Sequence, residues 1–160
     1  MEAVLSELMP QVPKNVFSNW LEQRVKLIWL DDNDDRLGMT RFEEGSVELV
    51  RRRRLKLDPG NITIGLHPRL IDEPKLLRHT LAHELLHASG VLEHTNELHD
   101  AVEKIAPGVA ISDSNLLQEK REEFLSDTRI KNWTCSHCGY VWQRSTIRKP
   151  KRCFKCARQL

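Results

Sequence analysis

The sequence predicts an α+β fold followed by a small metal-binding module. Short apolar and alternating runs fill much of the N-terminal half, as is typical of strands. Apolar residues at helical spacing dominate the stretch from residue 72 to residue 127. All four cysteines lie in the last part of the chain, in two Cys-x-x-Cys pairs. The 160 residues suffice for one medium-sized domain, predicted over residues 1–127, and a small appendage over residues 128–160.

The N-terminal part of the chain is predicted to supply a short helix and a small mixed sheet. Residues 1–13 contain two prolines and are interpreted as a loose lead-in. Apolar residues then recur at helical spacing, which predicts a helix over residues 14–24. Strands are predicted over residues 25–30, 38–42, 47–57 and 62–66.

Four consecutive arginines, Arg51 to Arg54, lie within the third predicted strand. On a strand their side chains alternate between the two faces, so both faces cannot be buried. This part of the strand therefore has to form an edge or project beyond the sheet. Two interpretations remain open, a solvated ribbon and a patch that contacts phosphate groups.

A longer helix is predicted to begin at the turn formed by Asp72, Glu73 and Pro74. Asp72 is the candidate N-cap, and Pro74 suits the first turn because its missing N–H costs nothing there. Leucines at intervals of four residues form a ridge that can pack on a sheet, and Gly90 is the expected stop. Two further helices are predicted over residues 95–106 and 114–127.

This helix carries His83 and His87 four residues apart, with Glu84 directly after the first histidine. Residues i and i+4 lie on one face of a helix, so both imidazoles can bind one ion. Glu84 lies farther round the helix and can reach a metal-bound water without ligating the metal. The spacing H-E-x-x-H is that of zinc peptidases. We therefore predict Glu84 as the catalytic base and the two histidines as zinc ligands; the alternative is an amphipathic helix that happens to carry two histidines.

A catalytic zinc needs three protein ligands and one open position. The candidates for the third ligand follow downstream and are Glu93, His94, Glu97, His99 and Asp100. The longer pattern H-E-x-x-H-x-x-G-x-x-H matches at Gly90, but its last position holds Glu93, and His94 comes one residue late. The residues alone leave the third ligand open.

The charges of the chain are unevenly divided. Residues 1–127 hold 16 Lys and Arg against all 23 Asp and Glu, whereas residues 128–160 hold nine Lys and Arg and no acid. The contrast supports a boundary near Asp127 and favours a polyanionic partner for the tail. The alternative is a merely solvated basic tail.

The cysteines of the tail, Cys135 with Cys138 and Cys153 with Cys156, predict a structural zinc site. Four thiolates at tetrahedral reach leave no open position on the metal. A module this small has almost no core, so the metal is expected to supply its folding energy. Redox-active dithiols are the alternative.

The basic tail also carries aromatic side chains, as stacking platforms for single-stranded nucleic acids do. Tyr140 and Phe154 are interpreted as the module's own small core, and Trp133 and Trp142 as the better candidates for stacking on bases. No base-reading motif is visible, so DNA binding is expected to be independent of sequence, with single-stranded DNA as a candidate. The predicted contacts are Trp142, Arg144, Arg148, Lys149, Lys151 and Arg152.

The segment L-x-x-T-L-x-H-E that ends at Glu84 resembles the central helix of SprT-like metallopeptidases, the family that includes the Spartan DNA–protein crosslink proteases. In that family the third ligand opens an H-G-x-x-[FW] segment. Here His94 matches the ligand, while Thr95 replaces the glycine and Leu98 the aromatic residue. The resemblance therefore implies His94 as the third zinc ligand, with Glu93 and His99 as alternatives.

The resemblance implies a zincin-like metallopeptidase domain over residues 1–127, followed by a four-cysteine zinc ribbon over residues 128–160 like the one that closes many family members. It implies two zinc ions, one catalytic and one structural. It also implies an endopeptidase that is recruited to or activated by DNA and cleaves DNA-bound or crosslinked proteins. The residue that steadies the oxyanion stays open, with Arg78, His79 and His99 as candidates.

Two other functions remain alternatives, a general intracellular zinc peptidase without DNA dependence and a non-catalytic, zinc-containing nucleic-acid-binding protein. No secretory signal and no apolar run long enough to span a membrane is visible. We expect a cytoplasmic, nucleoid- or DNA-associated monomer that acts on protein substrates and has no membrane partner.

Overall fold

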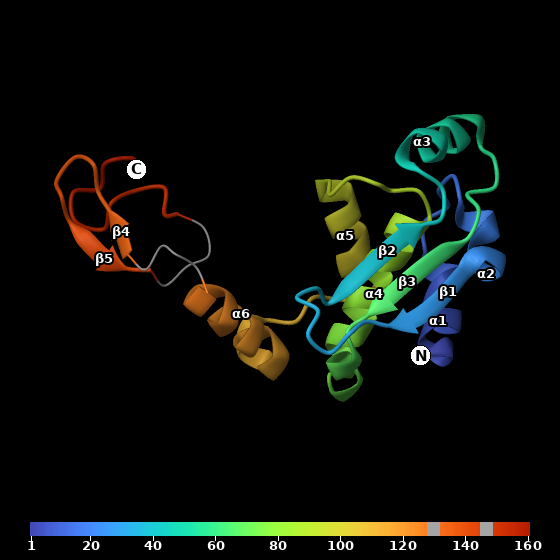
Figure 1. The fold of residues 1–160 in the computed structure, drawn as a ribbon, viewed down its shortest axis with the longest axis horizontal. Helices are drawn as coiled ribbons and strands as arrows, with labels where there is room; N and C mark the ends of the chain where they lie inside the picture. The colour runs from blue at the N-terminus through green and yellow to red at the C-terminus, as the bar shows by residue number, and fades with distance from the viewer. Residues whose placement is uncertain (128–131, 145–148) are drawn as a thin grey trace. The chain divides into compact units, whose positions relative to one another are not determined.

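The computed structural model describes residues 1–127, 132–144 and 149–160. These residues form two compact units, Met1–Ser114 and Asn115–Leu160, and each unit is treated by itself. Both contain helices and strands, so the α+β prediction is confirmed (Figure 1). No helix among the described residues is long and apolar enough to cross a membrane.

The N-terminal segment is folded onto the core, and the interpretation of residues 1–13 as a loose lead-in is wrong. Leu8 is completely buried and Val12 is buried as well, which ties this segment to the rest of the unit despite its two prolines. The helix predicted over residues 14–24 is confirmed only in its last part, because Phe17 turns inward before regular helix begins. The elements here are α1 (Glu2–Leu8), η1 (Met9–Gln11), η2 (Ser18–Trp20) and α2 (Leu21–Arg24).

Three of the four predicted strands are confirmed, and they form one mixed sheet in the order β1-β3-β2. The central strand β3 runs parallel to β1 and antiparallel to β2, with Ile64 opposite both Leu27 and Thr40. Four of the five β3 residues are buried, which fits its apolar sequence. The strands are β1 (Val25–Trp29), β2 (Gly38–Phe42) and β3 (Ile62–Leu66).

The strand predicted over residues 47–57 is wrong, because this segment forms helix α3 (Ser46–Leu55). Glu48 pairs with Arg51 at 3.0 Å and with Arg52 at 2.9 Å, which are the i,i+3 and i,i+4 contacts that stabilise a helix. Arginine is also a good helix former. Lys56 ends the helix in the left-handed conformation, with φ of 52°. These local ion pairs outweigh the preference of the β-branched Val47 and Val50 for a strand.

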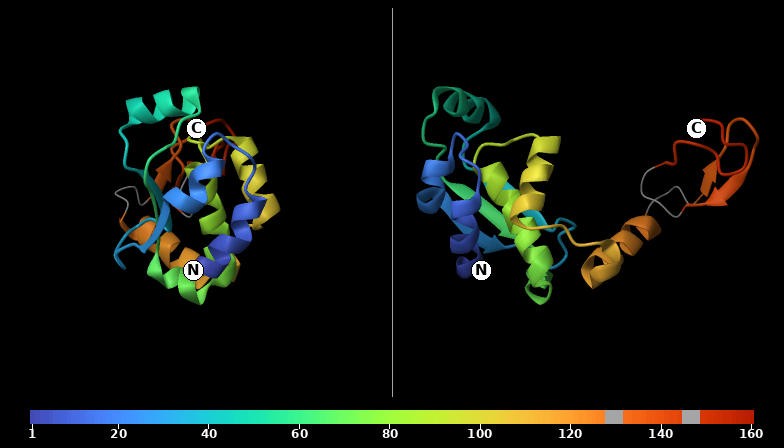
Figure 2. Two further views of the ribbon diagram at one scale, coloured as in Figure 1. Left: turned by 90° about the vertical axis from the view of Figure 1, so that its right-hand side faces the viewer. Right: turned by 180° about the vertical axis from the view of Figure 1, so that it is seen from behind.

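The remaining helices of the first unit follow the prediction. In Figure 1 the sheet lies in front of α4, and in Figure 2, seen from behind, α1, α4 and α5 lie over the sheet. Asp72 ends η3 and is not the N-cap of α4, which is Glu73, whereas Pro74 occupies the first turn as expected. The elements are η3 (Pro68–Asp72), α4 (Pro74–Ala88), α5 (Asn96–Ile105) and η4 (Ile111–Asp113).

The second unit contains one helix and a small hairpin. In the hairpin Trp133 lies opposite Trp142, and a single bridge joins Arg152 to Gln159 farther along the chain. Helix α6 groups with this unit, whereas the predicted boundary near Asp127 assigns its residues to the first domain; that boundary stays a prediction. The elements are α6 (Asn115–Asp127), β4 (Asn132–Thr134) and β5 (Val141–Gln143).

Candidate active site and metal centres

Helix α4 positions the first two histidines of the candidate active site because its opposite face is locked into the core. Leu77, Leu81 and Leu85 are buried against the sheet side of the unit. The helix ends at Ser89, and Gly90 follows with φ of +106°, a conformation that side chains rarely adopt. The predicted stop at Gly90 is therefore confirmed.

The N-terminal segment also holds the end of α4. The backbone N–H of Phe17 donates to the carbonyl of Ser89 at 3.0 Å, and the side chain of Asn15 donates to the Ser89 hydroxyl at 3.1 Å. A Cβ on Gly90 would lie 3.2 Å from the Phe17 ring, so the turn packs closely on that ring. The chain direction after the helix is thereby fixed.

The chain that leaves this turn brings His94 back to the two histidines of α4. The three Nε2 atoms form a triangle with sides of 3.0 Å between His83 and His87, 3.2 Å between His87 and His94, and 3.3 Å between His83 and His94. Nitrogens bound to one tetrahedral zinc ion are about 3.3 Å apart. The donor atoms present therefore fit a zinc ion held by three histidines.

The protonation of His83 and a hydrogen bond of His87 also suit metal binding. Burial, followed by the neighbouring His87 and His94, lowers the pKa of His83 to about 4, so the ring is neutral at pH 7. Nδ1 of His87 lies 2.6 Å from the carbonyl oxygen of Val91 and can donate a hydrogen bond to it. This contact favours the tautomer in which Nε2 carries the free lone pair.

The alternatives for the third ligand lie elsewhere. Among the described residues, the histidines whose ring nitrogens come close enough to share a metal ion are His83, His87 and His94. Glu93 is exposed, and its carbonyl accepts a hydrogen bond from the N–H of Thr95. His99 is exposed on α5. The assignment of His94 as ligand stays a proposal.

Glu84, the predicted base, is buried directly beside this triangle. Its Oε2 accepts a hydrogen bond of 2.7 Å from the hydroxyl of Thr40, which also donates to the Glu84 carbonyl at 3.0 Å. Burial raises the pKa of Glu84, while the Thr40 hydroxyl and the charges of His87 and His94 oppose that rise. The carboxyl group is thus poised to exchange a proton closer to neutral pH than an exposed glutamate.

Strand β2 supplies the part of the site that the sequence did not reveal. A Cβ on Gly38 would lie 2.6 Å from Glu84 Oε1, so only glycine lets the strand approach this carboxyl group so closely. Thr40, two residues on, faces the same way because side chains alternate along a strand. The signal was present as small residues at i and i+2, but nothing in the sequence linked this strand to α4.

The site opens into a pocket of about 370 Å³ between β2 and α4. Arg78, His79 and His99, the candidates for steadying an oxyanion, are absent from the described residues that line it. Arg78 pairs with Glu7 at 2.6 Å, and Nδ1 of His79 lies 2.9 Å from the carbonyl oxygen of Ala106. The pocket is lined by Gly38, Thr40, Phe42, His83, Glu84, His87, Leu92 and His94.

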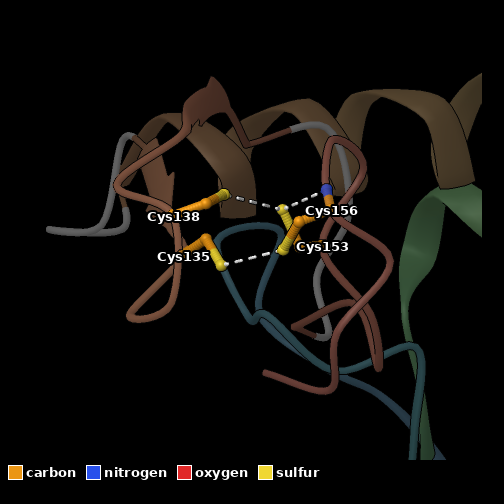
Figure 3. A group of neighbouring side chains, drawn as sticks. All are labelled: Cys135, Cys138, Cys153 and Cys156. Atoms are coloured by element: carbon orange, nitrogen blue, oxygen red, sulfur yellow. Dashed lines mark hydrogen bonds between the residues drawn. The ribbon is translucent and has the colours of Figure 1, made fainter.

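The second unit brings its four cysteines together, as Figure 3 shows. Sγ of Cys135 lies 3.7 Å from Sγ of Cys156, and Sγ of Cys138 lies 3.7 Å from Sγ of Cys153. Thiolates on one tetrahedral zinc ion are about 3.8 Å apart, so these atoms also fit a zinc ion. A disulfide needs sulfurs only about 2 Å apart.

The local backbone favours thiolate at one of these cysteines. Burial opposes the charge on Cys153, but the N–H groups of Cys156 and Lys155 point at its sulfur and lower its pKa to about 6. Such N–H contacts stabilise a metal-bound thiolate in the same way. The gathering of all four sulfurs around one point favours a metal site over a pair of redox dithiols.

The aromatic side chains of this unit lie differently from the prediction. Tyr140 and Phe154 were expected in a small core, but they are 38% and 65% exposed. They flank Trp142, with ring centroids 5.7 Å and 5.1 Å from its own. The prediction is wrong because so small a unit has no interior for them. Trp133 is half-buried and lies under the guanidinium of Arg144 at 5.2 Å.

The predicted DNA contacts divide into three groups. Lys149, Lys151 and Arg152 are exposed. Arg144 is folded over Trp133 and also over the Phe124 ring at 5.7 Å. The predicted contact at Arg148 lies outside the described residues.

Comparison with known proteins identifies the family of the first unit. The family model described as the SprT-like family matches residues 5–104, which include strand β2, helix α4 and all three histidines of the triangle. The matched segment ends before the second unit. No curated protein and no solved structure matches the chain.

Proposed function

Because the chain belongs to the SprT-like family, we propose that it is a zinc-dependent endopeptidase that cleaves proteins held on DNA. The family suggests a metalloprotease-type function for the first unit. The observation that carries the catalytic part is the triangle of His83, His87 and His94 with Glu84 in the same pocket. Three imidazole donors and an adjacent buried carboxyl group are what hydrolysis at a zinc site of the zincin type requires.

In this proposal the three histidines would hold a zinc ion, which would act as a Lewis acid and lower the pKa of the attacking water. Glu84 accepts the proton of that water and passes it to the nitrogen of the leaving amine. The Thr40 hydroxyl occupies Oε2, so Oε1, the oxygen beside Gly38, is the one that takes the proton.

The substrate is proposed to bind as an extended chain along β2. Strand β2 lies at the edge of the sheet. Among the described residues, one side of its backbone is not paired with another strand of this sheet. Gly38, Thr40 and Phe42 line the pocket from that strand. An extended peptide that adds to the edge gains backbone hydrogen bonds without a demand for particular side chains.

DNA recruitment is assigned to the second unit, residues 115–160 in the structure. The tail from residue 128 onwards has nine basic residues and no acid, and in it the half-buried Trp142 lies between the exposed rings of Tyr140 and Phe154. The ammonium of Lys155 lies 5.7 Å from the Tyr140 ring, so cation and stacking surface occur together. Stacking rings among cations suit single-stranded DNA of any sequence.

Casein cleavage with and without single-stranded DNA tests the proposal. We expect two zinc ions per chain, cleavage that DNA stimulates, and a loss of about 10² to 10⁴-fold in Glu84→Gln, because the variant cannot accept a proton. The variant should retain both zinc ions. Wild-type activity in Glu84→Gln would overturn the mechanism, and cleavage that DNA leaves unchanged would restrict the function to a general zinc peptidase.

A further inference from the structure

Helix α3 is poorly explained by packing. Of its ten residues only Leu49 is buried, so apolar burial does little to hold this helix on the unit. Val47 and Val50 are 86% and 58% exposed. The helix follows β2 at one end of the sheet, away from α1 and α4 (Figure 1). Packing in the core therefore does not explain the sequence of α3, and another role has to account for it.

One of the four arginines, Arg52, stabilises the helix and its flanking segments. Arg52 pairs with Glu44 at 3.0 Å and with Glu48 at 2.9 Å, and it donates to the carbonyl of Asp58 at 3.1 Å. These contacts join the start of the helix to the turn that follows it. Arg51 shares the carboxylate of Glu48 with Arg52.

The other basic residues of this segment are directed to solvent. Arg53, Arg54 and Lys56 are exposed, and their side chains form no ion pair or hydrogen bond with the described parts of the chain. Together with Arg51 they place four exposed cations within six residues, without an intervening acid. A stabilised helix terminus needs only one or two such charges.

The density of these cations is close to that of a nucleic acid. Counted over all sides of the helix, these four cations are spread over about 7.5 Å at the helical rise, which is about one charge per 2 Å. Arg51 and Arg54 lie on one side of the helix, and Arg53 and Lys56 lie on the other. Duplex DNA carries one phosphate charge per about 1.7 Å of its axis. The rest of the unit is acidic: residues 1–114 hold 19 Asp and Glu against 14 Lys and Arg, and five of those 14 lie in residues 51–56.

We propose that Arg51, Arg53, Arg54 and Lys56 form a second nucleic-acid-binding surface that contacts the phosphate backbone from the protease unit itself. The proposed function places DNA on the second unit alone, so this inference goes beyond it and rests on different residues. Helix α3 begins four residues after Phe42, which lines the pocket. Nucleic acid on this surface would lie near one end of β2, where a protein bound to it could enter the site.

An acidic protein is the rival partner for α3. Val47, Val50, Arg51 and Arg54 follow the spacing i, i+3, i+4 and i+7, so they share one face of the helix. A protein partner would bury the two valines, whereas a phosphate backbone has no need of them. The unbroken run of cations favours the nucleic acid, since protein surfaces mix charges. The valines therefore serve as the discriminating test.

The test uses the full-length chain with Lys149, Lys151 and Arg152 changed to Gln, so that binding by the second unit is weakened. Affinity for a fluorescein-labelled oligothymidine is measured by anisotropy over a series of KCl concentrations. Arg51→Gln with Arg53→Gln and Arg54→Gln should lower the affinity at low salt at least about tenfold. The slope of log affinity against log salt should fall by about 2, since each phosphate contact on a single strand contributes about 0.7.

The matched control changes Lys26, Lys75 and Lys104 to Gln, three exposed residues of the same unit, and thus removes the same net charge. It should change the affinity less than about twofold. Arg52 is kept, so circular dichroism should show an unchanged helix content. The inference fails if the arginine variant binds normally, if the control loses as much affinity, or if Val47→Ser with Val50→Ser weakens binding equally. Casein cleavage without DNA should be normal in the arginine variant, so failure of the protease proposal would show separately.

Discussion

The two candidate metal centres hold their ligands in opposite ways. His83 and His87 project from a 15-residue helix whose other face is buried under leucines, and His94 is returned to them by a tight turn at Gly90. In the second unit, the only buried residues described after residue 131 are Cys135 and Cys153, two of the ligands themselves. A hydrophobic core fixes the geometry of the histidine site. In the cysteine site, two of the ligands are themselves the buried residues.

This difference assigns different roles to the metal. A site whose geometry is fixed by packing can lose its ion and keep its shape, because the leucines continue to hold the helix. A site that has only thiolates at its centre depends on the ion for folding, since apolar burial is too small to offset chain entropy. Zinc is therefore predicted to be catalytic in the first unit, where it can be removed without unfolding. In the second unit it is predicted to be structural.

Removal of zinc should have the largest effect and should separate the two units. Chelation with 1,10-phenanthroline is expected to unfold residues 132–160, because the metal supplies on the order of 10 kcal/mol to such modules. Most of residues 1–114 should stay folded while activity is lost. Amide NMR spectra recorded during the titration measure both units at once.

The expected spectra show collapse of the signals from the second unit and persistence of those from β3 and α4. Addition of zinc should restore both spectrum and cleavage. If the first unit melts together with the second, its histidine triangle is not held by the core, and the contrast between the two centres is wrong. If neither unit melts, the four cysteines do not depend on a metal.

Gly38→Ala probes the packing that holds the first centre, and its effect should be smaller. The new Cβ would lie 2.6 Å from Glu84 Oε1 and 2.7 Å from a Thr80 methyl group, so the carboxyl group has to move. Displacement of a catalytic group by about 1 Å can cost about 100-fold in rate, and overpacking costs about 1 to 3 kcal/mol of stability. We expect cleavage to fall about 10 to 100-fold with both zinc ions retained.

Gly45→Ala is the matched control, because a Cβ at that position meets nothing within 4 Å. Its cleavage rate should stay within about twofold of wild type, with only a small loss of stability from the weaker N-cap. Equal activity of the two variants would show that β2 does not need to approach Glu84 closely. If Gly38→Ala lost zinc, the loss of activity would be due to disturbed zinc ligands rather than to displacement of the Glu84 carboxyl group.

The parts of the molecule that could be predicted from sequence are those with a fixed local geometry. The i,i+4 spacing of His83 and His87 places both on one helix face wherever that helix packs. The Cys-x-x-Cys pairs likewise need only short turns to aim their sulfurs at one point. Family resemblance then pointed to His94, whose nitrogen does lie with the other two.

The other parts of the fold and site depend on contacts between residues far apart in the chain, which sequence spacing does not reveal. Thr40 lies 44 positions before Glu84 in the chain, and only the docking of β2 on α4 brings the two together. The segment of helix α3 reads as a strand because Val47 and Val50 favour strands, whereas the ion pairs that Glu48 forms with Arg51 and Arg52 favour a helix. The exposure of Phe154 follows from the small size of its unit rather than from its own apolar character.

Thr40→Val should give the smallest effect and is the finest test of how the first centre is tuned. The variant keeps the shape of the side chain and removes the hydroxyl that donates to Glu84 Oε2. That hydrogen bond favours the charged carboxylate and lowers its pKa, so its loss should raise the pKa of Glu84 further. Catalysis needs the carboxylate, and therefore the acidic limb of the kcat/KM profile should move to higher pH.

A hydrogen bond to a charged carboxylate is stronger than one between neutral groups, so its loss should move the limb by a readily measured amount. Activity well above the limb should be almost unchanged, and both zinc ions should remain bound. Thr63→Val on β3, whose side chain does not line the pocket, serves as the control and should leave the profile in place. A limb that moves to lower pH, or that moves equally in both variants, would mean that Thr40 does not set the proton affinity of Glu84. The core would then hold the geometry of the first centre while other groups tune its acidity.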